Sequence, residues 1–326
     1  MSQPFENLPT TPLAAELLDQ AFSRAARSGR AKSGTDAQQS MLLTASNILS
    51  DNLENVVTEW PDFDRLDPFY YTLADAIVDV DELRQHLNEV GWASRKMTDI
   101  RHEYESRVSG DAETAKQFRE QAFARLADVV EEVGDDLEAI AEARDALRDL
   151  PDIRPDEPTI VVAGYPNVGK SSFVNAVTRA SNEEASYPFT TTEIQVGHIE
   201  RNHIRYQLVD TPGLLDRPPA ERNEVENQAV SALEHVADAV LVLLDPMGSC
   251  GYPLDAQIAL RDDIEDRFDV PVVTVYNKID DLEEMELVED SALMMSITAN
   301  ENVEGVLDAA VEAVDYEPEL PIDENR

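Results

Sequence analysis

The chain has 326 residues, and its 67 acidic residues outnumber its 26 basic residues to give a net charge of −41. A hydrophobic fraction of 42% is enough for packed cores and argues against a wholly disordered acidic protein. No apolar run reaches the ~20 residues of a membrane helix, no signal peptide is evident, and the single cysteine, Cys250, has no disulfide partner. We therefore expect a cytoplasmic protein without a membrane partner.

The excess of acidic residues also indicates a protein that works at high salt concentration. Five lysines against 21 arginines, with acid spread over both halves of the chain, resemble the composition of proteins from extreme halophiles. At ~1 M salt the screening length falls to ~3 Å, so a surface that repels itself in dilute buffer becomes tolerable. We expect a halophilic protein, and the net charge alone says little about nucleic-acid binding.

Residues 1–150 have the periodicity of amphipathic helices, with apolar residues every three or four positions. The stripe from Phe118 to Ile140 predicts one long helix, and a second continuous stripe runs from Leu73 to Val90. Together with short breaks near glycine and proline, this pattern predicts an N-terminal all-helical bundle. Further helices are expected at 13–22, 42–60 and 93–108.

A proline-rich segment, residues 151–158, predicts a linker after this bundle, because three prolines in eight residues end helices and stiffen the chain. Beyond it, short β-branched runs alternate with helical patterns, which predicts an α/β domain over 159–314 with a mostly parallel sheet. Residues 315–326 are expected to form an acidic tail. The predicted strands are 159–163, 206–209, 240–244 and 272–275, and the predicted helices are 171–179, 224–236, 254–267 and 303–314.

Residues 164–171 read G-x-x-x-x-G-K-S between a predicted strand and a predicted helix, which is the context of a phosphate-binding loop. Its glycines let backbone N–H groups approach phosphates, while Lys170 would reach the β- and γ-phosphates and Ser171 would hold Mg²⁺. No carboxylate occurs from residue 158 to 182, as a phosphate pocket requires. The predicted nucleotide-binding residues of this loop are Gly164, Tyr165, Pro166, Asn167, Val168, Gly169, Lys170, Ser171 and Ser172.

Two further motifs follow predicted strands. In D-x-x-G, Asp210 would join the Mg²⁺ shell and the Gly213 N–H would meet the γ-phosphate. In N-K-x-D, Asp280 would pair with N1–H and the amine of guanine, and adenine would leave it unpaired. Asn277 would address N7 and Lys278 would cover the base. In this order the motifs resemble a Ras-like P-loop GTPase domain that binds GTP and GDP with Mg²⁺.

The Ras-like resemblance also implies a threonine that closes on Mg²⁺ and a fifth element near guanine O6. Y-P-F-T-T at 187–191 resembles the Obg-type pattern, which selects Thr191, with Thr190 as the alternative. Ser296 and Ile297 would form the fifth element, although this segment departs from the usual Ser-Ala-Lys. The predicted Mg²⁺ ligands are therefore Ser171, Thr191 and Asp210.

Catalysis departs from the Ras pattern, because Leu214 stands where a glutamine orients the attacking water. The predicted catalytic set is Lys170, Thr191, Gly213 and Asn167. Asn167 resembles an asparagine that coordinates a monovalent cation in some related GTPases, which suggests K⁺ as a cofactor. The alternative is that Asn167 only shapes the loop. Slow hydrolysis without a partner is expected in either case.

Both halves together resemble the nucleolar GTP-binding protein 1 family, an Obg-related branch, over about residues 5–314. The segments that carry the resemblance are LPTTPLAAELLDQAFSRAAR, AGYPNVGKSSFVNAVTRA, ASYPFTT, DTPGLLDRP and CGYPLDAQ. The resemblance implies a GTP-hydrolysing switch in large ribosomal subunit assembly, whose helical domain contacts ribosomal RNA or protein of the subunit precursor; no DNA partner is expected. The chain stops soon after the predicted GTPase domain, without the C-terminal extension of eukaryotic members, which resembles an archaeal-type member.

The residues themselves support an RNA-facing helical end. Residues 20–50 contain one acid, Asp36, together with four cations. Ordinary solvated cations are the alternative, and the cluster Arg95, Lys96 and Arg101 is diluted by neighbouring acids. Two other functions stay open: a GTP-gated ribosome- or RNA-binding scaffold with negligible hydrolysis, and a membrane-transport GTPase that shares Asn167. The four cations are Arg24, Arg27, Arg30 and Lys32.

Overall fold

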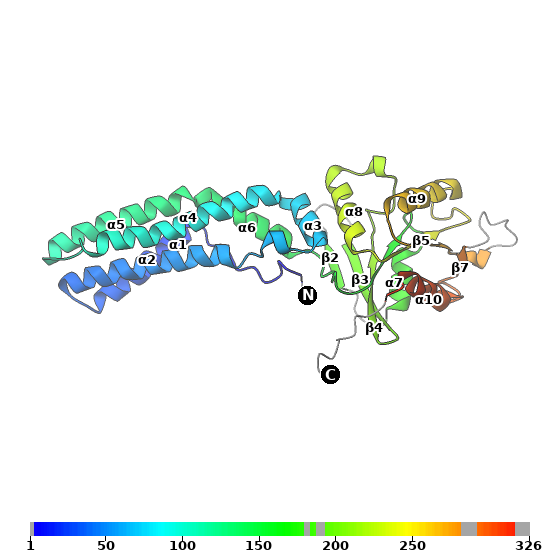
Figure 1. The fold of residues 1–326 in the computed structure, drawn as a ribbon, viewed down its shortest axis with the longest axis horizontal. Coiled ribbons are helices and arrows are strands. Elements are labelled where there is room, and N and C mark those ends of the chain that lie inside the picture. The colour runs from blue at the N-terminus through cyan, green and yellow to red at the C-terminus, as the bar shows by residue number, and fades with distance from the viewer. Residues whose placement is uncertain (1–2, 179–182, 187–192, 282–291, 317–326) are drawn as a thin grey trace, which may run out of the picture. The chain divides into compact units, whose positions relative to one another are not determined.

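The computed structural model describes residues 3–178, 183–186, 193–281 and 292–316, and its contacts divide the chain into two compact units (Figure 1). The helical unit comprises residues 5–65 and 78–148. The sheet unit comprises residues 1–4, 66–77 and 149–326. Residues 66–77, which lie within the predicted helical half, thus belong to the sheet unit. Of the helices in the described ranges, none is both long and apolar enough to cross a membrane.

The helical unit consists of amphipathic helices that pack their apolar stripes together. Helix α2 contacts α1, α4 and α5, and these helices run side by side in Figure 1. Leu53 on α2 and Met97 on α4 are fully buried in this core. The helices are α1 (Ala14–Arg30), α2 (Gly34–Thr58), α4 (Val80–Glu105), α5 (Ala112–Glu132) and α6 (Gly134–Arg148), with a short 3₁₀ turn η1 (Phe63–Arg65).

The helix boundaries correct three predictions. The single helix predicted over 118–140 is two helices, because α5 ends at Glu132 and α6 begins at Gly134, a poor helix former. The stripe over 73–90 is broken at Asp79, which has a positive φ of 47° and caps α4 by accepting a hydrogen bond from Glu82 N. The separate helix expected at 93–108 is instead the second half of α4. The apolar spacing continues across these breaks, so periodicity alone could not reveal them.

The proline-rich segment is held against the sheet unit by hydrogen bonds. Tyr70 Oη, on α3 (Pro68–Val78), donates to Ile153 O at 2.6 Å. The buried Gln207 side chain accepts from Arg154 N at 2.9 Å and donates to Arg154 O at 2.7 Å. These bonds satisfy backbone groups of an irregular segment, so residues 151–158 are anchored at one end of the sheet.

The sheet has seven strands among the described residues, in the order β2-β3-β4-β1-β5-β6-β7. Strands β4, β1, β5, β6 and β7 are parallel, and β2 and β3 are antiparallel to their neighbours. All residues of β1 and β5 are buried, as expected for central strands covered on both faces. The strands are β1 (Thr159–Ala163), β2 (Glu183–Ser186), β3 (Glu193–Arg201), β4 (Ile204–Asp210), β5 (Ala239–Leu244), β6 (Val272–Tyr276) and β7 (Leu293–Met294).

Helices cover this sheet on both sides: α7 contacts α10 and β4, α9 contacts β5 and β6, and Figure 1 shows α8 and α9 opposite α7 and α10. An all-helical N-terminal part followed by a mostly parallel α/β domain is confirmed. The predicted strands did not include β2, β3 or β7. Strand β3 joins β4 in a hairpin through Asn202 and His203, both at positive φ. The hairpin was not predicted because the sequence lacks the Asn-Gly pair that usually indicates such a turn. The remaining elements are α7 (Lys170–Val177), α8 (Glu224–Val236), α9 (Leu254–Arg267) and α10 (Val303–Val314), with 3₁₀ turns η2 (Pro219–Glu221) and η3 (Ile279–Asp281).

Candidate nucleotide-binding site

The G-x-x-x-x-G-K-S loop joins β1 to α7, and two of its glycines are required by the backbone. Gly164 has φ 130° and Gly169 has φ 112°, a region that L side chains rarely adopt. A Cβ at Gly164 would collide with Leu243 O, and one at Gly169 would collide with the Asn277 side chain. The loop can therefore lie this close to β5 and to residue 277 only with glycine at both positions.

Lys170 lies at the start of α7 with its ammonium group inside the loop. Its Nζ donates to Gly164 O at 2.7 Å and to Tyr165 O at 3.1 Å, and the side chain is buried. Burial lowers the pKa of Lys170, and the nearby charges of Asp210 and Asp216 oppose that effect. A bound phosphate would supply further negative charge and favour the ammonium form.

Ser171 and Asp210 place a hydroxyl and a carboxylate next to each other beside the loop. The Ser171 hydroxyl donates to Asp210 Oδ2, and the carboxylate is fully buried at the end of β4. Burial raises the pKa of Asp210, although the hydrogen bond from Ser171 and the charge of Lys170 act against it. Asp210 Oδ1 is buried with no hydrogen-bond partner among the described residues. An orphaned carboxylate oxygen next to a hydroxyl fits Mg²⁺, which takes few protein ligands and completes its shell with phosphates and water.

Side chains form hydrogen bonds to the backbone of the segment that follows Asp210. Gly213 N donates to Asp216 Oδ2 at 2.8 Å, and Arg217 donates to Gly213 O at 3.0 Å and to Glu226 at 2.8 Å. In this structure the Asp216 carboxylate thus accepts the hydrogen bond from the Gly213 N–H that the γ-phosphate is predicted to accept. Leu214 is fully buried, so this position offers no polar group to a water molecule.

Asn277, which follows β6, connects two other segments to the phosphate-binding loop. Its Nδ2 donates to Val168 O at 2.8 Å, and its Oδ1 accepts from Ile297 N at 3.4 Å. Ser296 is buried, and its hydroxyl accepts from Ala299 N at 2.9 Å. Asp280 is exposed on η3, where its carboxylate is accessible to a ligand.

The predicted site residues therefore come together from distant parts of the sequence. The phosphate-binding loop, the 210–213 segment and residues 277–278 follow β1, β4 and β6, at the carboxyl edge where α/β sheets bind ligands. Asn167 is exposed in the loop with φ 64°. Thr191 and its alternative Thr190 lie outside the described residues, and the other assigned roles stay predictions.

The sequence did not predict one segment of this site, the loop of residues 245–252 between β5 and α9. Asp245 accepts a hydrogen bond from Lys278 Nζ at 2.9 Å, and the Tyr252 ring stacks on the Tyr165 ring. Asp245 directly follows the buried strand β5, much as Asn277 follows β6 and Asp210 ends β4. A polar residue at the carboxyl end of a predicted strand was the sequence signal that could have identified this segment.

Comparison with known proteins matches both units. Residues 159–278 match the family model of the 50S ribosome-binding GTPase, and residues 5–154 match that of the NOG1 N-terminal helical domain. Together with the phosphate-binding loop between β1 and α7, these matches define a GTP-binding protein of the P-loop GTPase class with an N-terminal helical domain.

The relatives narrow this class. The chain is 34% identical to proteins named nucleolar GTP-binding protein 1 from Drosophila melanogaster and Arabidopsis thaliana, over 80% of its own length in both cases. It is also 34% identical to a Methanocaldococcus jannaschii protein named only as uncharacterized, covering 87% of this chain and 83% of that one. The chain belongs to the nucleolar GTP-binding protein 1 family. It spans 41% and 40% of the fly and plant relatives.

Proposed function

We propose that this protein is a GTP-hydrolysing switch in assembly of the large ribosomal subunit, acting in the cytoplasm. The observation that carries the proposal is the set of groups at one sheet edge: the buried Lys170 ammonium, the Ser171–Asp210 pair with its orphaned oxygen, and Asn277 bound to Val168 O. A triphosphate, a divalent cation and a base each find a suitable group there. The names of the family models and of the fly and plant relatives support the ribosomal role.

In the proposed complex, Ser171, Asp210 and Thr191 would hold Mg²⁺, and Lys170 would reach the β- and γ-phosphates. The Gly213 N–H binds the γ-phosphate after Asp216 withdraws from it, so GTP and GDP differ in what they require of the 213–217 segment. Asp280, Asn277 and Lys278 recognise guanine, with Ser296 and Ile297 beside it. The remaining loop residues Gly164, Tyr165, Pro166, Val168, Gly169 and Ser172 surround the phosphates. Tyr165, Val168, Gly169 and Ser172 offer backbone N–H groups, whereas Pro166 has none and the Gly164 N–H donates to Leu215 O.

Calorimetry with GDP and ADP in the presence of Mg²⁺ tests the pocket directly. GDP is expected to bind at least about 100-fold more tightly than ADP, because adenine presents an acceptor at N1 and no amine at C2 to the Asp280 carboxylate. Lys170→Met should abolish binding of both, and Lys116→Met, at an exposed position in the helical unit, should leave it unchanged. Equal affinity for the two nucleotides would contradict the proposal.

Hydrolysis in this site relies on charge stabilisation, since Leu214 is buried and cannot orient water. We assign that role to Lys170, the Gly213 N–H, Thr191 and a K⁺ ion held by Asn167, whose exposed side chain lies in the phosphate-binding loop. Hydrolysis should be faster in KCl than in NaCl at matched ionic strength, and Asn167→Ala should remove the difference. Equal rates of the unaltered protein in both salts would remove K⁺ from the mechanism.

The helical unit has a surface suited to RNA at the end of α1. Arg24, Arg30 and Lys32 are exposed and make no ion pair within the described part of the chain, whereas Arg107 and Arg125 both pair with Glu103. In a chain with 67 acids, cations that form no ion pair are the ones available to phosphate.

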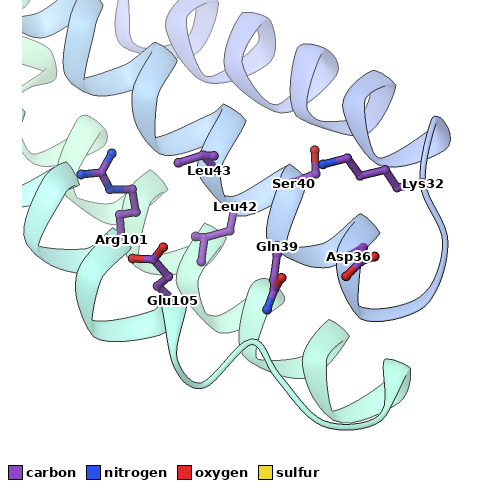
Figure 2. A pocket seen from close by; sticks show the side chains of 8 residues that line it. All are labelled: Lys32, Asp36, Gln39, Ser40, Leu42, Leu43, Arg101 and Glu105. Atoms are coloured by element: carbon purple, nitrogen blue, oxygen red, sulfur yellow. The ribbon is translucent and has the colours of Figure 1, made fainter.

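Lys32 also lines a hollow of about 440 Å³, with Lys32 and Arg101 on opposite sides and Leu43 between them (Figure 2). Arg101 donates to Asn47 Oδ1 at 2.8 Å, and the Leu43 side chain is 48% exposed. Asp36 and Glu105 also line the hollow, so it is not uniformly basic. We assign the cations to RNA phosphates and the exposed Leu43 to the apolar face of a ribose or base.

The triple variant Arg24→Ala, Arg30→Ala, Lys32→Ala tests this surface. Binding to large-subunit ribosomal RNA should weaken, and the slope of log affinity against log KCl concentration should fall by about 2–3, one unit for each lost phosphate contact. The matched control removes three cations that pair with carboxylates, Arg84, Arg107 and Arg125. A slope change as large in the control would refute a specific surface at the end of α1.

A GTP-gated scaffold with negligible hydrolysis remains the second candidate, and the buried Leu214 favours it. Single-turnover hydrolysis with and without large subunits separates the two. Stimulation by the subunits supports the switch, and co-sedimentation with immature large subunits in high KCl without any stimulation supports the scaffold.

A further inference from the structure

The loop of residues 245–252, which we call the clasp loop, is organised around one buried carboxylate. Asp245 is fully buried at the end of β5. Its Oδ2 accepts from Ser249 Oγ at 2.7 Å, Cys250 N at 2.7 Å and Lys278 Nζ at 2.9 Å, and its Oδ1 accepts from Met247 N at 3.1 Å. Every one of these donors except Lys278 belongs to the clasp loop itself.

The Asp245–Lys278 pair is held as an ion pair. Burial raises the pKa of Asp245, but the hydrogen bonds donated by Ser249, Lys278 and Cys250 outweigh it and leave the pKa below its ordinary value. The Lys278 side chain is 30% exposed, and its ammonium also donates to Ser249 Oγ at 3.2 Å. A lysine with two acceptors has lost much of the rotational freedom of its four-carbon stem.

The other end of the clasp loop reaches the phosphate-binding loop. The Tyr252 ring stacks on the Tyr165 ring with centroids 4.2 Å apart and planes inclined by 30°. Gln257, buried on α9, donates to Asp245 O at 3.0 Å and to Tyr252 O at 2.8 Å, so one side chain ties the two ends of the loop together.

We propose that the clasp loop positions both halves of the nucleotide site. Asp245 is a positioning residue that holds the Lys278 ammonium, which keeps the lysine stem ready for the base. Tyr252 supports Tyr165, and with it the backbone that binds phosphates. The proposal rests on the role proposed above for Lys278 in guanine binding.

The physical basis is preorganisation. The backbone of Lys278 has φ 63°, an uncommon conformation for a lysine. Without Asp245 to accept a hydrogen bond from its ammonium group, the Lys278 side chain would sample many rotamers. Fixing one long side chain before binding corresponds to a gain in affinity of up to about tenfold, because the rotational freedom of that side chain is lost before the nucleotide arrives. The rigid Tyr165–Tyr252 stack acts in the same way on the phosphate-binding loop.

A double-mutant cycle on the full chain tests the first half of the proposal, with fluorescent GDP as the probe. Asp245→Asn, which keeps the shape and an acceptor oxygen, should weaken GDP binding about tenfold. Lys278→Met, which keeps an apolar stem but no ammonium, should also weaken binding. Combined with Lys278→Met, Asp245→Asn should have little further effect, because the group it positions is gone.

The cycle separates positioning from folding. If Asp245 only stabilised the clasp loop, its replacement would weaken binding equally with and without the Lys278 ammonium, and additive losses would overturn the proposal. Asp255→Asn, at an exposed acid in the first turn of α9, is the matched control and should bind as the unaltered protein does. If the unaltered protein itself failed to bind GDP, the proposed function would fail rather than this inference.

Tyr252 tests the second half. Tyr252→Ala should weaken GDP binding about threefold to tenfold, because it removes the ring that supports Tyr165. Tyr252→Phe keeps the ring and should bind normally. An alanine variant that binds like the unaltered protein, or a phenylalanine variant as weak as the alanine one, would refute a role for the stack.

Discussion

Replacing Asn277 with alanine perturbs the contact that joins three segments of the proposed site. Asn277 is 2% exposed and donates to the buried Val168 O at 2.8 Å, while Ile297 N donates to it at 3.4 Å. Alanine leaves the Val168 carbonyl buried without a donor, which costs about 1–3 kcal/mol, and removes a second, longer hydrogen bond. We expect a loss of about 2–4 kcal/mol of stability in the nucleotide-free protein, or roughly 10 °C in melting temperature.

Scanning calorimetry of the nucleotide-free full chain measures this loss apart from nucleotide contacts. Asn277→Asp sharpens the test, because a carboxylate has no hydrogen to donate and would face Val168 O directly. The expected order of melting temperature at neutral pH is the unaltered protein, then the alanine variant, then the aspartate variant. Asn55→Ala, at an exposed position on α2, is the control and should change little. An Asn277→Ala protein that melts like the unaltered one would refute the structural role assigned to this side chain.

Three further predictions concern charge and metal. Burial raises the pKa of Asp210 in the folded protein, so the folded protein binds the Asp210 proton more tightly than the unfolded chain does. The free energy of unfolding therefore falls as the pH rises from the pKa of the unfolded chain, near 4, through the higher pKa of the folded protein. Asp210→Asn should therefore raise the melting temperature of the nucleotide-free protein at pH 7 by about 2–4 °C and should lose that advantage in acid. It should also abolish Mg²⁺-dependent GTP binding. A variant that is less stable than the unaltered protein at pH 7 would contradict the expected direction of the stability change. Ser171→Ala should weaken GTP binding at least about tenfold in Mg²⁺ and change it little in EDTA, whereas an equal loss in both would show that the hydroxyl does not serve the metal. With a net charge of −41, the melting temperature should rise steadily as KCl increases from about 0.1 M to 2 M, and a flat profile would remove charge repulsion as the reason.

Several helix boundaries were predictable because their signals are local. Helix α8 begins after Asn223, which forms a capping box with Glu226, and α9 begins after Pro253, so both match the predicted ranges. The break between α5 and α6 was missed because the apolar stripe continues across it, from Val129 through Val133 to Leu137. Periodicity reports which face is buried, and it does not report where the backbone stops being helical.

By itself, the sequence determined the class of the protein and the local chemistry of its site. Gly164, Gly169, Lys170 and Ser171 are close neighbours in the chain, and the backbone of the loop requires the two glycines wherever the loop packs. Only the tertiary structure decided which side chains hold the motif residues in place. Asp245 lies 33 positions from Lys278, and Asn277 lies 109 from Val168. Such pairs depend on the order and register of parallel strands, and no spacing along the chain encodes which strand ends become neighbours.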